Sequence, residues 1–125
     1  MKVLMISGDR NTLDTKSDTG KRMAEYKVTL GELDILLAYG SIFRFLGAFF
    51  SGLKFLWQKN PDVITAQDVE HALLAWIFSN LFRIHWQMQI HTDILSPYFV
   101  SVRHLGFNAV SNRVRVWLAK FLLPR

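Results

Sequence analysis

Short apolar runs alternate along the chain with longer segments whose apolar residues have helical spacing, and this alternation constrains the fold most. The runs have the lengths of β-strands and cover residues 2–6, 32–39, 63–67 and 87–91. Helices are predicted over residues 20–27, 42–58, 69–82 and 112–123. Such alternation is typical of a parallel sheet with helices on both faces, and right-handed crossovers make it doubly wound. The sequence therefore predicts an α/β, Rossmann-like domain with a mainly parallel sheet.

Composition limits the chain to one globular domain without cysteine chemistry. The 125 residues are half apolar and one-fifth charged, which excludes a disordered chain and suits a single domain over residues 1–125. The absence of cysteine excludes disulfides and thiolate metal sites. The four histidines show no helical i, i+4 pairing, so we expect neither a metal nor another cofactor.

Charge is distributed unevenly, with a net charge of +5 and no acidic residue after Asp93. A basic end favours phosphate-bearing partners such as a nucleotide or an anionic membrane surface, although a solvated basic face explains it equally well. Nucleic acid is disfavoured because the aromatic residues lie on apolar faces. The N-terminus lacks the pattern of a secretory signal, and no apolar run reaches the roughly 18 residues that span a bilayer. We therefore expect a cytoplasmic protein.

The segment 42–59 is unusually aromatic and also carries Arg44, Lys54 and Lys59. One interpretation places this helix in a membrane interface. The other places it between the sheet and a further domain or partner chain, since a helix that is apolar all round is usually buried. The second interpretation is favoured.

Polar residues follow several predicted strands, at the sheet edge where α/β proteins bind ligands. The candidates are Ser7, Gly8, Asp9 and Arg10 after the first strand, Asp68 after the third, and His91, Thr92 and Asp93 after the fourth. Each also has a structural explanation. Residues 8–19 form a polar loop, Asp68 suits a helix N-cap, Asp93 suits a turn, and a histidine often bonds a local backbone group.

Several of these segments together resemble a known enzyme domain. The pattern is DVITAQD, LLAW, MQIHTD, SPYF, NRVR and LAKFLLPR, joined by residues 2–7 and by Arg22, Met23 and Tyr26. It is similar to the N-terminal domain of group 1, or family 4, glycosyltransferases. The resemblance runs through most of the chain and is weakest in residues 8–19 and 40–60.

The resemblance implies the N-terminal half of a GT-B architecture, in which two Rossmann-like domains face each other across a cleft. Such enzymes move a sugar from a nucleotide-sugar to an acceptor with retention of configuration. The N-terminal domain binds the acceptor, often lipid-linked at the cytoplasmic face of a membrane. The resemblance also implies that His91 lines the cleft beside the transferred sugar, and Asp93 is a candidate to orient it. The remaining candidates, Ser7 to Arg10, Asp68 and Thr92, bind acceptor or phosphate.

The nucleotide-sugar-binding domain of that family has no counterpart in these 125 residues. We therefore expect a fragment, a truncated reading frame or one half of a split enzyme, inactive alone and with an apolar patch where the second domain packs. In addition, the family often has a glycine pair after the first strand, where this chain has only Gly8. The alternative function is a non-catalytic Rossmann-like module or helper subunit, recruited to a membrane or a nucleotide.

Overall fold

A computed structural model describes residues 1–38, 42–89 and 107–122. The elements are listed here in chain order: β1 (Lys2–Ser7), the 3₁₀ turn η1 (Arg10–Leu13), α1 (Asp18–Leu30), β2 (Glu32–Leu37), α2 (Ile42–Lys59), β3 (Val63–Gln67), α3 (Asp68–Phe82), β4 (His85–Gln89) and α5 (Phe107–Leu122).

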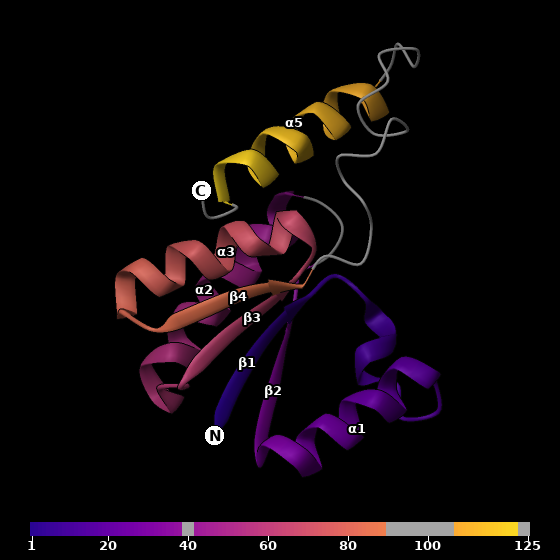
Figure 1. Cartoon of the computed structure of the whole chain (residues 1–125), viewed down its shortest axis with the longest axis vertical. Helices are drawn as coiled ribbons and strands as arrows, with labels where there is room; N and C mark the ends of the chain where they lie inside the picture. Colours follow the sequence, from indigo (N-terminus) through magenta and orange to yellow (C-terminus); the bar gives the residue numbers. More distant parts are fainter. Residues whose placement is uncertain (39–41, 90–106, 123–125) are drawn as a thin grey trace.

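The described strands form one parallel four-stranded sheet in the order β2-β1-β3-β4. In Figure 1, α1 lies on one face of this sheet, and α2, α3 and α5 lie on the other. The predicted α/β class, the parallel sheet and the covering of both faces are confirmed. Residues of β1 are buried almost throughout, as expected for a central parallel strand covered on both sides.

Alternate residues of β1 enter two separate cores. Leu4 and Ile6 belong to the large core beneath α2, α3 and α5, whose members also include Ile64, Leu56 and Phe78. Val3 and Met5 belong to a small core with Leu33 and with Met23 of α1. The α1 face therefore has much less apolar contact than the opposite face.

Several predicted boundaries differ from the structure. Residues 8–19 were expected to form a loop, yet η1 and the start of α1 lie there. Ser17 begins α1 because its hydroxyl accepts a hydrogen bond from the Gly20 N–H at 2.9 Å. The strand expected over residues 87–91 begins earlier, at His85, because its alternating pattern starts there. The last helix likewise starts at Phe107.

Exposed apolar side chains are concentrated on two helices among the described residues. They include Phe43, Leu46, Phe50 and Trp57 of α2, and Val114, Trp117 and Phe121 of α5. On α5 the rings pack together, with Trp117 stacked on Phe121 and Phe121 edge-on to Trp76 of α3. Within the described ranges, no helix has the length and apolarity needed to cross a bilayer.

Candidate functional site

The sheet has a topological switch point between β1 and β3. The chain leaves β1 for β2 on one side and later enters β3 on the other side of β1. Connections that diverge in this way leave a crevice outside the carboxyl ends of the two strands, where open α/β proteins bind ligands. Ser7, Gly8 and Asp9 follow one strand end, and Gln67 and Asp68 follow the other.

Hydrogen bonds tie these two strand ends together. The buried hydroxyl of Ser7 donates to the Gln67 Oε1 atom at 2.5 Å and accepts from the backbone N–H of Asp9 at 3.1 Å. A carboxylate oxygen of Asp9 accepts from the Asn11 N–H at 2.9 Å, which fixes the start of η1. Ser7 therefore acts beneath the site, where it orients Gln67 and the loop that carries Asp9.

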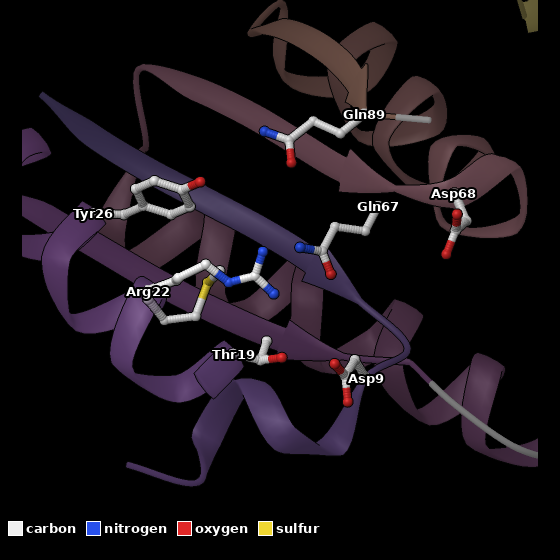
Figure 2. Close-up of a pocket in the computed structure, with 8 residues that line it drawn as sticks. Asp9, Thr19, Arg22, Tyr26, Gln67, Asp68 and Gln89 are labelled. Carbon is white, nitrogen blue, oxygen red and sulfur yellow. The ribbon is translucent and has the colours of Figure 1, made fainter. Parts of the chain in front are cut away.

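A pocket of about 230 Å³ opens at this switch point between α1 and the sheet. It is lined by Asp9, Thr19, Arg22, Met23, Tyr26, Gln67, Asp68 and Gln89. Figure 2 shows Arg22 and Tyr26 reaching from α1 toward the amide groups of Gln67 and Gln89. Drug-sized ligand pockets usually measure roughly 300–1,000 Å³, so this one lies below that range.

The pocket lining contains both hydrogen-bond donors and hydrogen-bond acceptors. Asp9 and Asp68 accept hydrogen bonds, Arg22 donates them, and the glutamine amides do both. Within the part of the chain that the structure describes, the Arg22 guanidinium has no hydrogen-bond or ion-pair partner. It is therefore free to bond a ligand.

The polar character continues from the pocket along the α1-facing side of β3 and β4. Thr65 pairs with Gln87 and Gln67 pairs with Gln89 on this side of the sheet. The Thr65 hydroxyl is buried and has no partner among the described groups. The other face of β4 carries Trp86 and Met88, which pack on the large core. The α1-facing side of β4 therefore carries amides.

Asp68 has an unusual backbone conformation for a side chain in a pocket wall. Its φ is +67°, in the left-handed region that few residues other than glycine adopt. The N-cap position belongs to Gln67, whose side chain makes no capping bond, and Asp68 is the first helical residue. The interpretation of Asp68 as the N-cap is therefore wrong. Left-handed residues cluster at functional sites, where the surrounding structure holds the strain.

His71 lies behind the pocket and joins three strand ends. Its Nδ1 is 2.5 Å from the Gln67 carbonyl oxygen, and its Nε2 is 2.6 Å from the Ala38 carbonyl oxygen just after β2. The ring also contacts Gly8, where a Cβ atom would lie only 2.6 Å from the His71 Cε1 atom. Sequence reasoning gave His71 no role, and no local pattern predicts its contact with Ala38.

The structure brings together Gly8, Asp9 and Asp68 at one edge, with Ser7 beneath them. Arg10 is exposed in η1 and does not line the pocket. His91, Thr92 and Asp93 lie outside the described residues.

The candidate site residues predicted from the sequence did not include the side chains of α1 or the two glutamines, although Arg22, Met23 and Tyr26 belong to the resemblance pattern. A signal was present, because Thr19, Arg22, Met23 and Tyr26 follow the i, i+3, i+4, i+7 spacing of one helix face. An arginine and a tyrosine on the face that packs toward a strand end indicate a site. Among the described side chains, no three His, Asp or Glu residues gather as a metal site.

No family model, curated protein or solved structure matches this chain. The functional argument therefore depends on the fold, the pocket and the sequence pattern.

Proposed function

We propose that this chain is the acceptor-binding half of a retaining glycosyltransferase with a GT-B architecture. The observation that carries the proposal is the polar pocket at the switch point, where α1 and the ends of three strands contribute side chains. The sequence pattern that resembles family 4 glycosyltransferases adds support because it includes Arg22, Met23 and Tyr26 as well as Gln67, Asp68 and Gln89.

The chemistry of the lining favours a hydroxylated, uncharged group over a phosphate. Asp9 and Asp68 contribute two carboxylates to a lining that has one guanidinium, and carboxylates repel phosphate while accepting hydrogen bonds from sugar hydroxyls. The space beside Gly8 is filled by the His71 ring, so the close backbone approach that a glycine gives to a phosphate is blocked on this side. Met23 and the Tyr26 ring supply apolar surface for the C–H face of a sugar.

In this proposal each residue has a definite task. Asp9 and Asp68 accept bonds from acceptor hydroxyls, Arg22 donates to an acceptor oxygen, and Gln67 and Gln89 fix the orientation of the ring. His91 and Asp93, which lie outside the described residues, remain the residues that we predict beside the transferred sugar. The nucleotide-sugar is a substrate bound by a second domain or a partner chain, so the isolated chain has no turnover and needs no metal.

Saturation-transfer NMR on the full chain tests the proposal. The probes are the methyl glycosides of glucose, mannose and N-acetylglucosamine, with uridine diphosphate and inorganic phosphate as competitors. We expect at least one glycoside to bind and both Asp68→Asn and Gln89→Ala to weaken it at least about tenfold. Gln58→Ala, which changes an exposed glutamine on α2, is the matched control and should have no effect.

Two results would contradict the proposal. In one, no glycoside binds to a folded chain. In the other, uridine diphosphate or inorganic phosphate binds at Arg22 without displacing a glycoside. That result would favour the non-catalytic nucleotide-binding module.

A further inference from the structure

The glutamines of the pocket belong to the first of two polar rows that cross the α1-facing side of the sheet. In the first row, the Ser7 hydroxyl of β1 donates to the Gln67 amide of β3, and Gln67 pairs in register with Gln89 of β4. The second row, two residues earlier on each strand, consists of Thr65 on β3 and Gln87 on β4. Side chains at i and i+2 share one face of a strand and are about 6.6 Å apart, so the second row runs beside the first.

The second row repeats the arrangement of a hydroxyl beside the amide of the next strand, but its polar groups are not bonded to each other. Thr65 is 2% exposed, and its hydroxyl has no hydrogen-bond partner among the described groups. Gln87, its register partner, is exposed to solvent. Native structures rarely keep a buried hydroxyl without a partner. The second row therefore holds a donor and an amide that the described part of the fold does not use.

The α1-facing side of β4 is open among the described elements. There, α1 packs mainly on β2 and η1, whereas β4 packs mainly on β3 and on α3 of the opposite face. Strands of parallel sheets are usually buried on both faces, so an open face of amides is unusual for a purely structural surface. Figure 2 shows Tyr26 farther from the strand ends than Arg22, on the side of the pocket toward the second row. Its side chain is 44% exposed.

We propose that the second row binds a second sugar residue, so that the acceptor is a glycan of at least two residues. The Gln87 amide donates to one hydroxyl of this sugar and accepts from another. The Thr65 hydroxyl donates to the Gln87 Oε1 atom and orients the amide, as the Ser7 hydroxyl orients Gln67 in the first row. The Tyr26 ring offers apolar surface to the C–H face of the second sugar.

This inference rests on the proposed function, in which the first sugar residue occupies the pocket. A row of hydroxyl and amide groups carries no charge, which favours a neutral, hydroxylated ligand over a phosphate or a cation. A peptide could also bond to the amides. The continuity of the second row with the pocket lining, through Gln67 and Gln89, favours a second residue of the same glycan.

The test is saturation-transfer NMR on the full chain with methyl glycosides of one and of two sugar residues. The probes are the methyl glycosides of glucose, mannose and N-acetylglucosamine, and those of maltose, mannobiose and chitobiose. We expect at least one disaccharide to bind at least about fivefold more tightly than its own monosaccharide, the gain from one further hydrogen bond. Gln87→Ala and Thr65→Val should each remove most of this gain and leave the binding of the monosaccharide unchanged.

His85→Ala is the matched control, because His85 is exposed on the same face of β4, one row farther from the pocket; it should bind both lengths like the wild type. Circular dichroism and thermal melting confirm that each variant is folded.

A site for a second sugar is excluded if a monosaccharide binds and its disaccharide binds no more tightly, or if Gln87→Ala weakens both lengths equally. It is also excluded if acetyl-tetraalanine amide binds, Gln87→Ala abolishes that binding and no disaccharide binds more tightly than its monosaccharide, since the row then holds a peptide. If no glycoside of either length binds a folded chain, the proposed function itself is contradicted, and the second-sugar site with it.

Discussion

At the scale of single residues, the site depends on close contacts that join strands far apart in sequence. Gly8 follows β1, and the His71 ring lies where a larger residue would place its Cβ atom. The same ring is within hydrogen-bonding distance of carbonyl oxygens after β2 and at the end of β3. A small residue at position 8 is thus required by packing.

Gly8→Ala is expected to lower the free energy of unfolding by about 1–3 kcal/mol, because the displaced ring loses its hydrogen bond to a backbone carbonyl. In a His71→Ala background the same change should cost less than about 0.5 kcal/mol, since the obstacle is gone. Urea denaturation of the four chains in this cycle measures both values. If Gly8→Ala lowered the free energy of unfolding equally in the two backgrounds, the Gly8–His71 contact would not be the cause of the destabilisation.

The left-handed backbone at Asp68 gives a second residue-scale prediction. Asparagine tolerates this conformation, whereas a β-branched residue does not. Asp68→Asn should therefore change the free energy of unfolding by less than about 0.5 kcal/mol, and Asp68→Val should lower it by about 1–2 kcal/mol. Chemical denaturation ranks the two variants. An Asp68→Val variant as stable as the wild type would mean that the positive φ imposes no constraint.

At the scale of elements, α2 has two faces with opposite tolerance to added volume. Its two glycines differ only in which face they occupy. A Cβ atom at Gly47 would have no neighbour within 4 Å, while one at Gly52 would lie 2.5 Å from the Phe78 ring. Helix propensity is the same at both positions, so packing alone separates them.

Gly47→Ala is expected to raise the free energy of unfolding by about 0.5–1 kcal/mol, the usual gain when alanine replaces glycine inside a helix. Gly52→Ala should lower it by about 1–3 kcal/mol because the methyl group overpacks the core. Thermal denaturation of the two single variants gives both signs. If both variants were stabilised, α2 would not pack on α3 through Gly52.

At the scale of the whole molecule, the helices on the two faces of the sheet have unequal apolar contact with it. The large core joins α2, α3 and α5 to the sheet, whereas α1 is held by a small cluster around Val3, Met5 and Met23. The pocket lies on the weaker side, between α1 and the strand ends. Elements with few buried contacts open locally at low free energy, and binding sites are often drawn from them.

Backbone amides of α1 are therefore expected to exchange with solvent at least about tenfold faster than those in the middle of α3. Native-state hydrogen exchange followed by NMR measures the two rates. A bound glycoside should slow exchange in α1 and leave the middle of α3 unchanged. Among the described residues, α3 contributes only its first residue, Asp68, to the pocket lining, whereas α1 contributes several side chains. Equal exchange rates in α1 and α3 would contradict the inference that α1 is held less firmly than α3.

Local sequence patterns determined the element types, the parallel sheet and the edge where a ligand would bind, because short apolar runs and helical periodicity depend on neighbouring residues. They placed Gly8, Asp9 and Asp68 at that edge for the same reason. The tertiary structure alone decided the strand order, the meeting of His71 with Ala38 and the entry of Arg22, Tyr26 and Gln89 into the pocket. These contacts depend on how α1 crosses the sheet and on which strands become neighbours. The side of α2 that remains exposed was likewise decided by packing, since both of its faces are apolar in sequence.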